Sequence, residues 1–190
     1  MVNLLFFSLF PNSYLNLYER ENRKISSGFV FLAVILISFA KILIHLLMYY
    51  KSHGHIFSSI LWWPGLILFS YLFVFLFCSL IAFYADLSHK THEKSDRVSF
   101  YLFFLLTYSP LLLTPGVAVL YKFFVPQFSN FYFIYLTFFV WIFILQIKTI
   151  SQFFKFSGIQ AVFAYFFAFI FLGLFFIVYF FNLIFSMLVR

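Results

Sequence analysis

The stretch GLILFSYLFVFLFCSLIAFYA, residues 65–85, decides the fold class of this chain because it contains no Asp, Glu, Lys or Arg. A helix needs about 20 predominantly apolar residues to cross the roughly 30 Å hydrocarbon core of a bilayer. The whole chain has the same character: 65% of its 190 residues are hydrophobic, 9% are charged and the mean hydropathy is +1.07. These values exclude an ordinary soluble domain and a disordered chain. We therefore expect a protein that lies in a lipid bilayer.

The chain contains five such apolar stretches, of which the first is interrupted only by Lys41. They predict an all-α fold, a polytopic transmembrane helical bundle with five spans. A cytoplasmic or interfacial segment, residues 1–26, is expected to precede a membrane domain formed by residues 27–190. The predicted spans are residues 27–49, 65–85, 98–120, 130–147 and 159–182.

Prolines set the expected limits and breaks of two spans. Proline removes a helical donor and clashes with the preceding turn, so Pro64 is expected to place the start of the second span near Gly65, with Ile56–Trp63 at the headgroup level. An alternative with six spans requires a re-entrant pair between residues 56 and 85. Pro110 and Pro115 predict a kink or a break in the third span.

Basic residues predict how the spans are threaded, because short cytoplasmic loops are enriched in Lys and Arg. With a cytoplasmic N-terminus, eight basic residues lie inside and three lie outside. The inner set is Arg20, Arg23, Lys24, Lys90, Lys94, Arg97, Lys148 and Lys155, and the outer set is Lys51, Lys122 and Arg190. Because these residues are scattered between apolar runs, we expect anionic lipid headgroups as their partners and no nucleic acid.

Lys41 and His45 form the most unusual polar pair of the first predicted span. They are four residues apart and therefore lie on one face of a helix. A lysine within a span marks a pathway, a partner or a side chain that snorkels to the interface. Two interpretations stay open: Lys41 snorkels, or it lines a polar groove with His45.

Further candidates lie at Asp86 and at the step formed by Tyr108 and Pro110. Asp86 belongs to a polar loop with His89, His92 and Glu93, and a separate H-x-H pair lies at residues 53–55. The predicted topology places these two groups on opposite sides of the membrane, so we expect no metal site. The freed carbonyls at the Tyr108 and Pro110 step are expected to be satisfied locally by Thr107 or Ser109.

No motif for covalent catalysis, nucleotide binding or metalloprotease chemistry is present in the sequence, and the predicted spans contain no carboxylate pair. We expect no enzyme activity and no cofactor. The single cysteine, Cys78, is expected to be a small core residue, and Trp141, Gln146 and Gln160 are expected to serve helix contacts and interfacial anchoring.

Three segments together resemble the Yip1-domain family in its bacterial and archaeal branch. They are FSLFPNSYLNLYERE (Phe7–Glu21), FYADLSHKTHEKSDRVSFYLFFLLTYSPLLL (Phe83–Leu113) and WIFILQIKTISQFFKFSGIQAVFAYF (Trp141–Phe166). The resemblance covers roughly residues 7–182. The Gly-Gly-Lys-Gly type loop of prokaryotic relatives is replaced by His-Lys-Thr-His at residues 89–92, and the eukaryotic Asp-Leu-Tyr-Gly-Pro element is absent.

The resemblance implies five spans with a cytoplasmic N-terminus, and it supplies no catalytic residues. We expect a non-enzymatic multipass protein, a scaffold, assembly factor or accessory subunit of a membrane complex, with lipids and other integral membrane proteins as partners. The bacterial inner membrane is favoured over a eukaryotic endomembrane. The alternative is a subunit for small-molecule or lipid transport, with a polar site at Lys41 and His45 and at the break of Pro110 and Pro115.

Overall fold

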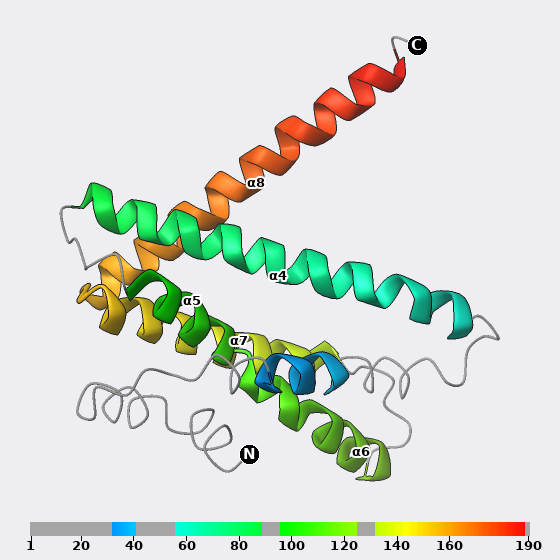
Figure 1. The fold of residues 1–190 in the computed structure, drawn as a ribbon. Coiled ribbons are helices and arrows are strands. Elements are labelled where there is room, and N and C mark those ends of the chain that lie inside the picture. Colours follow the sequence, from blue (N-terminus) through cyan, green and yellow to red (C-terminus); the bar gives the residue numbers. More distant parts are fainter. Residues whose placement is uncertain (1–31, 41–55, 89–95, 125–131, 189–190) are drawn as a thin grey trace.

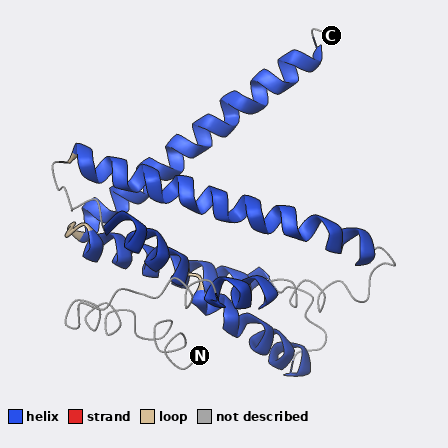
Figure 2. Cartoon of the chain, in the orientation of Figure 1, coloured by secondary structure: helices blue, strands red, loops and turns tan. Residues whose placement is uncertain are grey.

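The computed structural model describes residues 32–40, 56–88, 96–124 and 132–188 (Figure 1). In these ranges the regular structure is helical, with no strand (Figure 2). Residues 32–40 are helical, and the further elements are α4 (Ile56–Leu87), α5 (Asp96–Leu106), the 3-10 helix η1 (Ser109–Leu113), α6 (Thr114–Phe124), α7 (Tyr132–Phe153) and α8 (Gly158–Leu188).

Four segments of the described chain are long and apolar enough to cross a membrane. They are Ile67–Leu87, Arg97–Tyr121, Leu136–Phe153 and Gly158–Asn182. Each corresponds to one of the last four spans that the sequence predicts. Of the first predicted span, residues 27–49, the structure describes only residues 32–40, which are helical.

The second of the predicted spans belongs to a helix that begins earlier than expected. α4 starts at Ile56 and continues through Pro64, so the proline does not begin the helix, while the apolar span within α4 begins at Ile67, close to the expected span start near Gly65. The continuous helix also excludes a re-entrant pair between residues 56 and 85. Pro64 nevertheless lies before the apolar segment that begins at Ile67, and there water can satisfy the carbonyl that the proline leaves free.

The third of the predicted spans is broken, as the two prolines predict. α5 ends at Leu106, η1 contains Pro110 near its start, and α6 begins one residue before Pro115. The Thr114 hydroxyl donates to the Leu111 carbonyl (2.6 Å), the carbonyl that a residue other than proline at position 115 would bond. Local hydroxyl groups therefore replace part of the missing helical hydrogen bonding.

α4 and α8 cross through a face of small residues. Ala161, Ala164 and Ala168 of α8 are fully buried, and their spacing of three and four residues places them on one face of that helix. The buried residues of α4 include Cys78, Ala82 and Ala85, so Cys78 is a small core residue as expected. Small side chains let two backbones approach closely, which is how helices associate in a membrane.

A tight corner of residues 154–157 joins α7 to α8. The Phe156 N–H donates to the Ser151 carbonyl (2.9 Å), and Lys155 has a positive φ of 51°, the pattern of a Schellman motif. Ser157 and Gln160 then form a capping box, in which each backbone N–H bonds the other side chain at 3.2 and 3.3 Å. The corner thus satisfies both helix ends within four residues.

Aromatic side chains pack this end of the bundle. Phe154 and Phe156 are buried, and their rings contact Phe100 (4.8 Å between centroids) and Tyr84 (6.1 Å) respectively. These contacts bring the end of α4, the start of α5 and the α7–α8 corner to the same end of the molecule (Figure 1). The end is therefore fixed by rings from α4, α5 and the α7–α8 corner.

Candidate functional site

Tyr108 lies where the third span is broken and lines two cavities. Tyr108 follows α5 and immediately precedes η1, so it belongs to neither of these helices. One cavity, of about 270 Å³, lies between residues 32–40, α4 and α5, and the other, of about 340 Å³, lies between the break, α7 and α8. The break therefore places the Tyr108 side chain between the two cavities.

The first cavity has apolar walls with one hydroxyl cluster. Its lining residues are Val34, Ile37, Phe69, Ser70, Tyr71, Phe73, Val74, Leu105 and Tyr108. The Tyr71 and Ser38 hydroxyls lie 2.7 Å apart, and they lie 3.1 and 2.8 Å respectively from the Val34 carbonyl. Two hydroxyl protons serve these three contacts, which tie α4 to the helix of residues 32–40.

The second cavity carries more polar chemistry. It is lined by Tyr108, Phe139, Val140, Ile142, Phe143, Gln146 and Tyr165. Gln146 of α7 is buried, and its side chain hydrogen-bonds Tyr108. Gln146 therefore serves a helix contact as expected, and Gln160 serves the cap of α8.

Among the described residues, neither hydroxyl beside Pro110 makes the expected bond to the carbonyl that this proline frees, that of Leu106. The Thr107 hydroxyl donates to the Phe104 carbonyl (2.6 Å), whereas the buried Ser109 hydroxyl has no hydrogen-bond partner among the described residues. Pro110 itself is buried within η1. An unpaired hydroxyl at this depth has a cost of about 1–3 kcal/mol, which a polar partner would remove.

Asp86 lies apart from these cavities. Its carboxylate accepts a hydrogen bond from the Arg97 guanidinium (2.5 Å), and both side chains are substantially exposed, at 39% and 51%. Arg97 is eleven residues before Tyr108, about 16 Å along a helix. Asp86 thus joins the ends of α4 and α5, and an exposed pair of this kind contributes about 0–1 kcal/mol.

The other predicted candidates lie outside the described residues. They are Lys41 and His45 of the expected groove and the possible ligands at residues 53, 55, 89, 92 and 93. Among the residues that the structure does describe, no group of three or more His, Cys, Asp or Glu side chains is placed to hold a metal ion.

Only some of the residues that line the two cavities were candidates from the sequence. Tyr108 was identified from the sequence, whereas Tyr71 and Tyr165 were not, because a tyrosine within an apolar run gives no signal until its neighbours are known. Neither cavity is lined by a charged residue among the described ones, so both suit uncharged molecules. No family model, no curated protein and no solved structure matches this chain.

Proposed function

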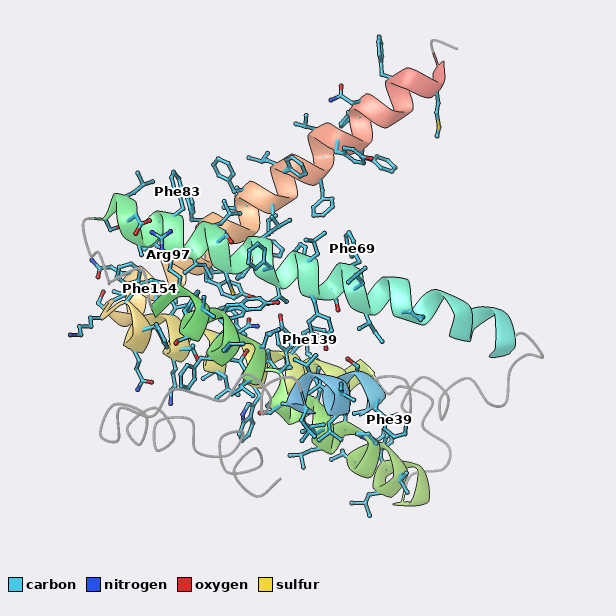
Figure 3. The ribbon with its side chains drawn as sticks, viewed as in Figure 1. Phe39, Phe69, Phe83, Arg97, Phe139 and Phe154 are labelled. Carbon is cyan, nitrogen blue, oxygen red and sulfur yellow. The ribbon has the colours of Figure 1, made fainter. Side chains whose placement is uncertain are left out.

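We propose that this chain is a non-enzymatic multipass membrane protein of Yip1-like type that acts as a scaffold, assembly factor or accessory subunit of a membrane complex. Its partners are membrane lipids and other integral membrane proteins. One observation carries the proposal: the outer half of α8, residues 174–188, packs the Phe176 ring against Phe69 and Phe73 of α4 and then projects beyond the other helices (Figures 1 and 3). Such a helix presents its surface to whatever surrounds the bundle.

From Leu174 to Phe181, α8 exposes large apolar and aromatic side chains on every side. Each residue from Leu174 to Phe181 is exposed, with exposed fractions from 37% at Phe176 to 69% at Phe181. α8 is 31 residues long, about 46 Å, which exceeds the roughly 30 Å hydrocarbon core. An apolar surface of this extent in a multipass protein supports contact with lipid and with the spans of other proteins.

The proposed orientation places the aromatic end of the bundle in the cytoplasm. Arg97 lies in the first turn of α5 and Lys155 in the α7–α8 corner, both at this end, while Lys148 lies five residues before the end of α7. Basic residues next to spans favour the cytoplasmic side and attract anionic lipids. We therefore place the protein in the bacterial inner membrane with five spans and a cytoplasmic N-terminus. Tags placed before Met1 and after Arg190 should become accessible on opposite sides.

Quantitative co-purification in a mild detergent tests the proposed role. The triple variant Phe175→Ala, Tyr179→Ala, Phe180→Ala reduces the exposed ring surface of α8, and it should lower the recovery of the bound membrane protein several-fold. The matched control, Leu68→Ala, Leu72→Ala, Leu76→Ala, trims three exposed residues of α4 and should leave recovery unchanged. A monodisperse monomer with no co-purifying protein or lipid would contradict the proposal.

A second candidate function is a subunit for small-molecule or lipid transport. The observation that favours it is the pair of cavities at the break, both lined by Tyr108. If Lys41 and His45 form part of the path, Lys41→Leu should abolish uptake of the transported molecule. A snorkelling lysine should tolerate the same change with little effect on stability.

A further inference from the structure

Three polar side chains line the cavity of about 340 Å³, and each comes from a different segment. Tyr108 precedes η1, Gln146 lies in α7 and Tyr165 lies in α8. Gln146 and Tyr165 are each seven residues from the helix end at the α7–α8 corner, about 10 Å along the helix. The three groups therefore lie at membrane depth, where water is scarce.

Hydrogen-bonding capacity is left over in this cavity. Tyr108 and Gln146 bond each other, which uses one bond of an amide that can donate two and accept two. The Tyr165 ring packs against Phe77 (4.9 Å) and Phe143 (5.0 Å), while its hydroxyl has no hydrogen bond to any other described residue. An amide and a hydroxyl with unused donors and acceptors thus line the same space.

The other lining residues of the cavity favour a ligand that is uncharged and mostly apolar. These residues are aromatic or aliphatic and none is charged, so a charged headgroup would lose its hydration without compensation. Phe139 and Val140 on its rim are 63% and 52% exposed, which opens the cavity toward the side of the bundle that faces lipid. Cavities of about 150 Å³ already bind benzene, so this one has room for part of an alkyl chain.

We propose that this cavity binds an uncharged lipid-like alcohol, with its hydroxyl between Gln146 and Tyr165 and its chain directed past Phe139 and Val140 into the bilayer. A hydroxyl both donates and accepts, so it can bond both unused groups, whereas an ester or ketone carbonyl only accepts. Binding of this ligand goes beyond the proposed scaffold role, which requires no bound small molecule, and it does not require transport.

Photolabelling of the full chain in phosphatidylcholine nanodiscs tests the site. The probe is dodecanol with a diazirine in its chain, and the comparison probes are the matching dodecane and dodecyl acetate. The alcohol should label the α7 and α8 segments that line the cavity, and unlabelled dodecanol should compete. Equal labelling by the dodecane or the acetate, labelling spread along the outer half of α8, or absence of competition would each overturn the proposal.

Two variants separate the polar contacts from the shape of the cavity. Tyr165→Phe keeps the ring and removes the hydroxyl, and it should weaken competition by dodecanol about three- to tenfold while labelling by the alkane stays unchanged. The matched control Tyr179→Phe removes an exposed hydroxyl on the same helix and should have no effect. Equal competition in both variants would overturn the role of Tyr165. The wild-type competition decides the proposal if Tyr165→Phe fails to fold.

The test of the alcohol site can be distinguished from the test of the scaffold role. Co-purification depends on the outer half of α8, whereas the alcohol site depends on residues next to its inner, packed half. Loss of alcohol labelling with intact co-purification would reject the site alone, and the opposite result would reject the scaffold alone.

Discussion

The third predicted span and α8 differ in how deeply they are buried and in whether their helix is continuous. The third span, Arg97–Tyr121, is 50% buried within the protein and is broken by two prolines, whereas α8 is continuous and its span, Gly158–Asn182, is 22% buried. In lipid every backbone N–H and C=O needs an internal partner. A break is therefore tolerated where neighbouring side chains cover it, and a span that faces lipid on most sides stays helical throughout.

Truncation of one ring in each region should give the largest difference. Phe104→Ala removes a fully buried ring of the broken span and should lower the free energy of unfolding by about 3 kcal/mol, since lipid-like surroundings leave mainly the cavity cost. Phe180→Ala, at 62% exposure on α8, should change it by less than about 0.5 kcal/mol. Unfolding by SDS titration measures both, and equal losses would remove the distinction between the two regions.

Overpacking tests whether α8 itself has two different halves. Ala164→Leu places a larger side chain in the crossing with α4 and should cost about 1–3 kcal/mol. Val178→Phe makes a comparable enlargement in the exposed half and should be nearly neutral. SDS titration again measures the change in the free energy of unfolding. A neutral Ala164→Leu would mean that the two helices do not approach closely at this residue.

The break should be sensitive to one hydroxyl. Thr114→Val keeps the shape of the side chain and removes the donor to the Leu111 carbonyl, so it should cost about 0.5–1.5 kcal/mol. Ser79→Ala removes a hydroxyl that bonds a carbonyl within the intact, exposed surface of α4 and serves as the control, with a smaller expected change. If both substitutions have the same effect, the break has no special need for the threonine.

The smallest effect is expected in the corner that ends α7. Lys155 occupies the left-handed region that glycine adopts without a steric penalty, so Lys155→Gly should raise the free energy of unfolding by a few tenths of a kcal/mol. Lys148→Gly, inside α7, should instead lower it by about 0.5–1 kcal/mol. Thermal unfolding followed by circular dichroism compares the two, and a loss of stability in Lys155→Gly would contradict the assignment of the corner.

Much of the helical architecture follows from the apolar runs, and the deviations have local causes. Lys148 was expected to follow the end of the fourth span at residue 147, yet α7 continues to Phe153 because the hydrogen bonds of the Schellman motif, and not the charge, end the helix. Pro64 was expected to place the start of the second span near Gly65, and the apolar span begins at Ile67. The helix itself continues through Pro64, because a proline interrupts a helix only where the lost hydrogen bond cannot be replaced.

The candidate site was predictable only in part. Pro110 indicated a break, and Tyr108 beside it was a candidate on the sequence alone. Tyr165 lies 57 residues further along the chain, and no periodicity within α8 indicates that it lines the same cavity as Tyr108. That proximity depends on how α7 and α8 pack around the break. It is a property of the assembled bundle and not of any single segment.

The short corner at residues 154–157 decides which part of the bundle can yield. Both helix ends are satisfied and the Phe154 and Phe156 rings of the corner are buried, so we expect the α7–α8 hairpin to resist opening at this end. Any widening of the cavity they share must come from its third wall. There the interrupted backbone of η1 has fewer α-helical hydrogen bonds to break, so we expect the segment around the prolines to move more easily than α7 or α8.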